Sequence, residues 1–104
     1  MEDFVKRSLL YDFYGEMLTE HQKDIYEAYV LENLSLGEIA ESEGISRQGA
    51  HDIIRRCNIA LEGYESKLHL VEKFLQVKEM VARIESSTDL GEARKIAEEI
   101  LEYL

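Results

Sequence analysis

Apolar residues recur at steps of three and four along nearly the whole chain, which is the spacing of an amphipathic α-helix. The chain has no proline and only 6 glycines among 104 residues, so strong helix breakers are scarce. We therefore predict an all-α fold of five or six helices. The predicted helices cover about residues 4–17, 20–31 and 36–43, a longer stretch from Ser46 past Leu61 toward residue 84, and a last segment after Asp89.

Capping signals mark where several of these helices begin. In a capping box, a short polar side chain accepts from an amide of the first turn, and a glutamate or glutamine three residues later reaches back. Gly44 stands where the 36–43 helix should end, because glycine readily takes the left-handed conformation of a helix C-terminus. Ser46 is expected to cap the next helix. The predicted capping boxes are Thr19 with Gln22, Ser35 with Glu38 and Asp89 with Glu92.

The apolar stripes of the first two helices and the lone cysteine predict part of the core. A single cysteine cannot form an intramolecular disulfide, and we interpret Cys57 as a small core residue. The other predicted core positions are Phe4, Leu9 or Leu10, Tyr14, Met17, Ile25, Tyr26, Tyr29 and Val30.

The stretch LGEIAESEGISRQGAHDIIR, residues 36–55, meets the physical requirements of a helix-turn-helix. Ala40 is small enough for two helices to approach, Gly44 permits a positive φ in the turn, and Ile45 can fill the corner. An ordinary helical hairpin with the same core is the alternative. Along the following helix, Ala50, Ile53, Ile54, Cys57 and Leu61 form the inner side, and Arg47, Gln48, His51, Asp52 and Arg55 lie mainly on the other.

Size and composition narrow the class of protein. A chain of 104 residues with 45% hydrophobic and 33% charged residues suits one soluble core, and no apolar run approaches the roughly 20 residues of a membrane span. The N-terminal segment MEDFVKRSLLYDF lacks the pattern of a signal peptide, so we expect a cytoplasmic protein. We find no metal-ligand spacing among the histidines and Cys57, no nucleophile elbow and no glycine-rich phosphate loop. We therefore predict a non-enzyme without metal or cofactor.

Charge singles out the predicted second helix of the motif. The chain has a net charge of −10, yet residues 46–58 carry three arginines against one aspartate. We predict that this segment binds DNA or RNA, with Gln48 suited to an adenine edge and the arginines to phosphate or guanine. Solvated arginines, or arginines paired with acidic neighbours, are the alternative, and three arginines alone imply weak binding by a monomer. The predicted nucleic-acid-binding residues are Ser46, Arg47, Gln48, His51, Arg55 and Arg56.

The C-terminal part carries an apolar face too wide for a two-stranded seam. We divide the chain into a helix-turn-helix domain, residues 1–67, and a helical extension, residues 68–104, and predict a homodimer through residues after Leu61. Packing within one chain is the alternative. The two stripes are Leu61, Tyr64, Leu68, Val71 and Leu75, and Leu70, Phe74, Val77, Val81 and Ile84; the last helix adds Leu90, Ala93, Ile96, Ala97, Ile100, Leu101 and Leu104.

A resemblance to known families extends this interpretation. Residues 18–68, with LSLGEIAE and ISRQ, resemble region 4 of bacterial sigma factors. With the preceding LLYDFYGEM and the following LHLVEKF, residues 9–75 are similar to the YlxM-like family, whose genes commonly neighbour those of the signal recognition particle GTPases. The resemblance implies a sigma-region-4-like helix-turn-helix bundle and a regulatory role in the signal recognition particle pathway, with particle components as partners. A protein-binding adaptor in that pathway, without nucleic-acid contact, is the alternative.

Overall fold

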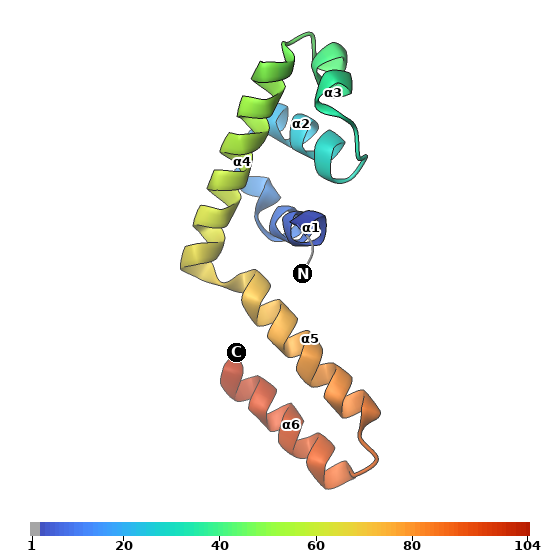
Figure 1. The fold of residues 1–104 in the computed structure, drawn as a ribbon. Coiled ribbons are helices and arrows are strands. Elements are labelled where there is room, and N and C mark those ends of the chain that lie inside the picture. The colour runs from blue at the N-terminus through green and yellow to red at the C-terminus, as the bar shows by residue number, and fades with distance from the viewer. Residues whose placement is uncertain (1–2) are drawn as a thin grey trace. The chain divides into compact units, whose positions relative to one another are not determined.

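The computed structural model describes residues 3–104; Met1 and Glu2, which begin the predicted 1–67 domain and the N-terminal segment, lie outside this range. Six α-helices and one 3₁₀ turn make up the described chain, which contains no strand, so the predicted all-α fold is confirmed (Figure 1). The chain separates into two compact units, the first ending at Leu68 and the second spanning His69–Leu104. The elements are α1 (Asp3–Tyr14), η1 (Gly15–Met17), α2 (Glu20–Val30), α3 (Leu36–Glu43), α4 (Arg47–Leu68), α5 (Leu70–Ser86) and α6 (Leu90–Tyr103).

The first unit is built on α4, its longest helix. Helices α1, α2 and α3 all pack against α4 and lie on the same side of it (Figure 1). The α3–α4 pair forms the predicted helix-turn-helix. The buried apolar residues of this unit are Leu10, Tyr14, Leu18, Ile25, Tyr26, Val30, Ile39, Ala40, Ala50, Ile54, Cys57 and Leu61.

Two predicted core residues of the first helix are wrong. Met17 is 63% exposed because the α-helix gives way to a 3₁₀ turn at Gly15, which turns Met17 out of the apolar stripe. A Cβ atom at Gly15 would lie only 2.8 Å from the Tyr11 ring, so a glycine is needed for this close approach. Phe4 is 44% exposed because it lies in the first turn of α1; its ring lies beside that of Tyr29, with centroids 5.6 Å apart.

The local capping predictions in the first unit are confirmed. Thr19 and Ser35 each cap their helix in a reciprocal capping box with Gln22 and Glu38. Gly44 ends α3 in the left-handed conformation, at φ 68°. The Ser46 hydroxyl accepts a hydrogen bond from the Gly49 amide at 2.9 Å. These short-range bonds fix where the two helices of the motif end and begin.

Substitutions at the corner of the motif should destabilise the fold. Ala40 is buried, so Ala40→Leu should overpack the α3–α4 contact by roughly 1–3 kcal/mol. A Cβ atom added at Gly44 would meet no atom of the described residues within 4 Å, so the cost of Gly44→Val, about 1 kcal/mol or more, comes from the positive φ alone. Thermal unfolding measures both, and Gly44→Asn is the control because asparagine tolerates this conformation. Unchanged melting temperatures in both variants would contradict the assigned corner.

Buried ionisable groups should make this core sensitive to alkali. Burial raises the pKa of Tyr26 to about 12 and that of the Cys57 thiol to about 11. The folded state therefore keeps these protons above about pH 9, where the unfolded chain begins to lose them, so stability falls as pH rises toward 11. Cys57 should account for about 2 kcal/mol of that loss. Urea unfolding at pH 7 and pH 11 should show a smaller pH effect in Cys57→Ala; an equal effect in both proteins would contradict the assignment.

The second unit is a hairpin of two antiparallel helices, α5 and α6 (Figure 1). The predicted stripe from Leu61 to Leu75 does not run along one continuous helix, because His69 adopts a left-handed conformation, at φ 55°, and separates α4 from α5. At the start of α6, Asp89 caps the helix by accepting from the Gly91 amide, in place of the predicted reciprocal box with Glu92.

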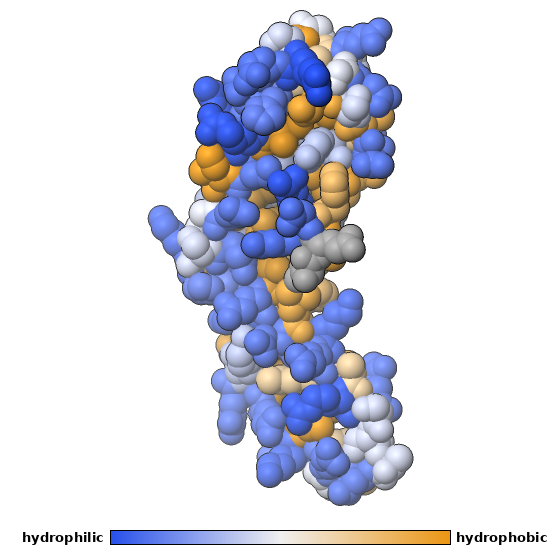
Figure 2. Space-filling view, viewed as in Figure 1, coloured by the Kyte–Doolittle hydropathy of each residue, from blue (hydrophilic) through white to orange (hydrophobic). Residues whose placement is uncertain are grey.

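Much of the apolar surface of the hairpin helices is exposed. Val71 and Ile96 are the buried residues of α5 and α6, and Ala93 and Ile100 are half-buried. Figure 2 shows hydrophobic side chains between the two helices on the visible face, bordered by hydrophilic ones. The large apolar residues that remain exposed on this hairpin are Leu70, Phe74, Val81, Leu90, Leu101 and Leu104.

Candidate nucleic-acid interface

The exposed face of α4 begins at the corner of the motif. Because an α-helix turns by about 100° per residue, residues four apart lie close together on one face. Arg47, His51 and Arg55 follow this spacing, and all three are exposed. Arg47 occupies the first helical position, immediately after the Ser46 cap, where free amides also face outward. The side of α4 that is predicted to bind nucleic acid is thus accessible from Arg47 to Arg55.

Two adjoining pockets open onto this face. The first, here termed the α4 N-terminal pocket, has a volume of about 450 Å³ and is lined by Leu36, Arg47, Gln48 and His51. The second, here termed the arginine pocket, has a volume of about 240 Å³. Leu36 and His51 line both pockets, so the two are neighbours on this face. The arginine pocket is lined by Arg7, Tyr29, Leu36, His51, Ile54, Arg55 and Asn58.

The charge of these pockets contrasts with that of the chain. No carboxylate is among the described residues that line either pocket, although the sequence has 22 acidic residues against 12 lysines and arginines. Arginine lines both pockets, and His51 adds an imidazole that is 54% exposed at its side chain. Together they form a local surface that is suited to an anionic ligand.

Two of the predicted site residues stand apart from these pockets. The Ser46 hydroxyl is already used in capping α4, so its oxygen serves the helix. Arg56 is exposed, but it lies about 100° around the helix from Arg55 and lines neither pocket. The structure therefore brings together Arg47, Gln48, His51 and Arg55 but not Arg56.

Asp52 contacts its neighbours on α4. Its Oδ1 accepts a hydrogen bond from Gln48 Nε2 at 3.0 Å and lies 3.7 Å from His51 Nδ1. Within residues 3–104, neither Arg55 nor Arg56 has a carboxylate within 4.0 Å. An adenine contact by the Gln48 amide group would therefore require this bond to be shared or broken, whereas the arginines are available to a ligand.

Sequence reasoning missed three residues of the arginine pocket. Arg7, Tyr29 and Asn58 come from α1, α2 and a later turn of α4. The only local signal was a basic pair, Lys6 and Arg7, in an otherwise acidic N-terminal segment. Nothing in the helical pattern of α1 indicated that Arg7 would meet the face of α4, because that contact depends on how the helices pack.

Comparisons with known proteins place this architecture in a family. The family model of UPF0122, which is described as "Putative helix-turn-helix protein, YlxM / p13 like", matches residues 1–100. The chain belongs to the UPF0122 family. It is 40% identical over 103 residues to a UPF0122 protein of Thermoanaerobacter sp. (strain X514), covering 99% of this chain and 88% of that protein.

Other members support the same assignment. A UPF0122 protein of Caldanaerobacter subterraneus subsp. tengcongensis is 47% identical over 83 residues, covering 80% of this chain and 71% of the relative. A UPF0122 protein of Symbiobacterium thermophilum is 41% identical over 98 residues, covering 91% of this chain and 92% of the relative. The predicted YlxM-like membership is confirmed, and the family's description agrees with the helix-turn-helix arrangement of α3 and α4.

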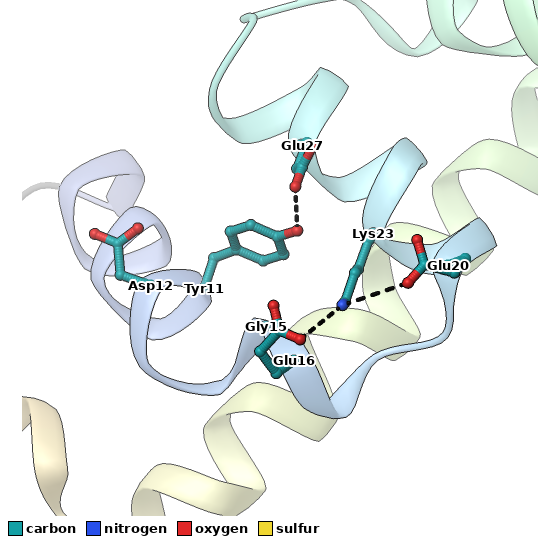
Figure 3. Close-up of a pocket in the computed structure, with 7 residues that line it drawn as sticks. All are labelled: Tyr11, Asp12, Gly15, Glu16, Glu20, Lys23 and Glu27. Atoms are coloured by element: carbon teal, nitrogen blue, oxygen red, sulfur yellow. Dashed lines mark hydrogen bonds and ion pairs between the residues drawn. The ribbon is translucent and has the colours of Figure 1, made fainter.

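A third pocket of this UPF0122 protein has the opposite charge. It lies where α1, η1 and α2 meet and is lined by Tyr11, Asp12, Gly15, Glu16, Glu20, Lys23 and Glu27 (Figure 3). The Tyr11 hydroxyl donates to Glu27 at 2.5 Å, and the Lys23 ammonium lies 3.1 Å from Glu16 and 3.6 Å from Glu20. Burial and the bond to Glu27 raise the pKa of Tyr11. The Tyr11–Glu27 bond ties α1 to α2 and the Lys23–Glu16 contact ties η1 to α2, and none of the predicted binding residues lies here.

No helix within residues 3–104 is both long enough and apolar enough to span a bilayer. In the same range, no three histidine, cysteine, aspartate or glutamate side chains are grouped so as to hold a metal ion.

Proposed function

We propose that this UPF0122 protein is a regulatory protein that binds DNA or RNA through the exposed face of α4. The observation that carries the proposal is the clustering of Arg47, His51 and Arg55 along two pockets without a lining carboxylate. In a chain of net charge −10, such a cluster is the surface on which a polyanion would be least repelled. At physiological salt, screening limits the reach of the distant acidic residues to roughly 8 Å.

The helix-turn-helix geometry supports this role. In such motifs the second helix presents its N-terminal residues to the bases, and amides at the helix start can meet a phosphate. Here Arg47 and Gln48 occupy the first turn of α4, and Arg55 lies eight residues beyond Arg47, about 80° around the helix from it, with His51 between them. We assign Arg47 and Arg55 to phosphate or guanine contacts and Gln48 to a base edge.

We place this regulation in the cytoplasm, within the signal recognition particle pathway. The support is the resemblance to the YlxM-like family, whose genes lie beside those of the signal recognition particle GTPases. On this proposal, components of the particle are its partners. Residues 1–67 would carry the binding face and residues 68–104 would form the association region.

We also propose that the protein acts as a homodimer whose copies meet through the α5–α6 hairpin. The hairpin unit spans only His69–Leu104. A domain of fewer than roughly 40 residues usually needs a disulfide, a metal or oligomerisation to be stable. It exposes large apolar side chains such as Phe74, Leu90 and Leu101. A second copy would cover them and would double the number of arginine contacts to nucleic acid.

A titration tests the proposed function directly. The purified protein is titrated into a fluorescein-labelled, mixed-sequence DNA duplex of about 20 base pairs and into an RNA hairpin of equal stem length, at about 50 and 200 mM KCl. We expect binding to at least one probe, weakening as salt increases. Binding to neither probe at the lower salt would reject the proposal and favour the protein-binding adaptor, which the acidic remainder of the surface suits.

A further inference from the structure

We infer that the arginine pocket is a phosphate-binding site that extends the nucleic-acid interface beyond the helix-turn-helix, with Arg7 of α1 as its main donor. The inference rests on the proposed function, because the phosphate it would hold is a phosphodiester of the bound DNA or RNA. It adds α1 and α2 to an interface that the sequence placed on α4 alone.

The guanidinium of Arg7 is held in position by Tyr29. Arg7 Nη1 donates to the Tyr29 hydroxyl oxygen at 3.1 Å, and the guanidinium carbon lies 5.8 Å from the centre of the Tyr29 ring. A guanidinium has five N–H donors, so most of them remain available to a ligand. The Tyr29 hydroxyl accepts this bond and keeps its own proton to donate. A positioned arginine of this kind binds an oxyanion with less loss of side-chain entropy.

Asn58, which also lines the pocket, is oriented by a buried partner. The hydroxyl of Tyr26, which has no exposed surface, donates to Asn58 Oδ1 at 2.5 Å. Because the oxygen of the amide is engaged there, its NH₂ group remains to donate into the pocket. Arg7, Asn58 and Arg55 thus line one pocket with hydrogen-bond donors from two helices.

The positive charge of the arginine pocket favours an anionic ligand. Among the residues that the structure describes, neither Arg7 nor Arg55 has a carboxylate within 4.0 Å. Two guanidinium groups that line one pocket without such a partner would be stabilised by a phosphate, which accepts bidentate bonds from arginine.

The size of the pocket favours one group of a larger ligand. Its volume of about 240 Å³ lies below the roughly 300–1,000 Å³ usual for a whole small molecule. It shares Leu36 and His51 with the neighbouring α4 N-terminal pocket, which Arg47 and Gln48 also line. A strand whose bases meet the start of α4 could therefore place a neighbouring phosphate against Arg7.

The test compares two single charge deletions on α1. Arg7→Ala should weaken binding of the duplex or hairpin probe about tenfold at about 50 mM KCl and should lower the slope of log affinity against log salt by about one unit. Lys6→Ala is the matched control, because it removes the same charge from an adjacent exposed residue that does not line the pocket. It should change affinity less than about twofold.

Two further variants separate binding from folding. Arg7→Lys keeps the charge and should restore part of the lost affinity, although it cannot make bidentate bonds. Tyr29→Phe keeps the ring but removes the hydroxyl that positions Arg7, and it should weaken binding a few-fold without changing the salt slope. Circular dichroism at the binding temperature confirms that each variant is folded.

The outcomes distinguish failure of the inference from failure of the proposed function. If the parent protein binds and Arg47→Ala weakens binding, but folded Arg7→Ala behaves as Lys6→Ala does, the arginine pocket is not a phosphate site while the α4 interface stands. If the parent binds neither probe, both the proposed function and this inference are rejected. A tenfold loss in Arg7→Ala with an unchanged salt slope would also overturn the phosphate assignment.

Discussion

Replacing Arg47 and Arg55 together by alanine should weaken nucleic-acid binding about 100-fold at about 50 mM KCl, with a salt slope lower by about two units. Each arginine lines one of the two adjoining pockets on α4, and each would lose one phosphate or base-edge contact. A loss of roughly 1.4 kcal/mol per contact corresponds to a factor of ten each. Both residues are exposed, so the variant should fold as the parent does.

The control for this variant removes the same charge elsewhere. Arg83 and Arg94 are exposed residues of α5 and α6, and Arg83→Ala with Arg94→Ala changes the net charge equally without touching α4. If the α4 face is the site, this control should retain affinity within a few-fold. A folded Arg47, Arg55 double variant that binds as the parent does would show that this face is not the nucleic-acid site, and the adaptor function would replace it.

Most of the helix boundaries and the α4 face could be predicted because they depend on short-range chemistry. Thr19, Ser35 and Ser46 cap helices through bonds to amides three residues ahead, and Gly44 ends a helix through its own backbone conformation. Helical phase alone then places Arg47, His51 and Arg55 in successive steps of about 40° around α4. Such signals lie within one or two turns of sequence, where a pattern can be recognised.

The features that escaped prediction depend on contacts that are distant in sequence or on unmarked backbone changes. Arg7 is bonded to Tyr29 across 22 positions, and Tyr26 orients Asn58 across 32 positions. The left-handed turn at His69 carries no glycine or proline signal, so the apolar stripe appeared continuous through it. For the same reason the sequence did not predict that Arg7 would line a pocket beside α4, or that Arg56 would line neither pocket.

The Leu101→Glu variant should convert a dimer into a monomer at micromolar concentration. Leu101 is 76% exposed on α6, among the exposed apolar residues that we propose a second copy covers. Placing a carboxylate in an apolar interface leaves a charge that must be desolvated without a partner, which costs several kcal/mol. Sedimentation of the intact parent protein should give twice the chain mass of 12.1 kDa, whereas the variant should give the mass of a single chain.

The matched control is Ile59→Glu. Ile59 is an apolar residue of α4, in the first unit, and is 59% exposed, so this substitution adds the same charge to an exposed apolar position outside the hairpin. It should remain dimeric. Salt gives a second test: residues 69–104 carry five basic and eight acidic side chains, so two hairpins repel and association should tighten as salt increases. A parent protein that sediments as a monomer throughout the micromolar range would contradict the proposed dimer.

Dimerisation and nucleic-acid binding should be coupled through the number of arginines that engage one ligand. A dimer brings two α4 faces to one molecule of DNA or RNA, so the number of released counterions, and with it the salt slope, should double relative to a monomer. Leu101→Glu lies outside the α4 face and leaves its arginines intact. We therefore expect this variant to bind the same probe with about half the salt slope of the parent; equal slopes in the two proteins would mean that each chain binds alone.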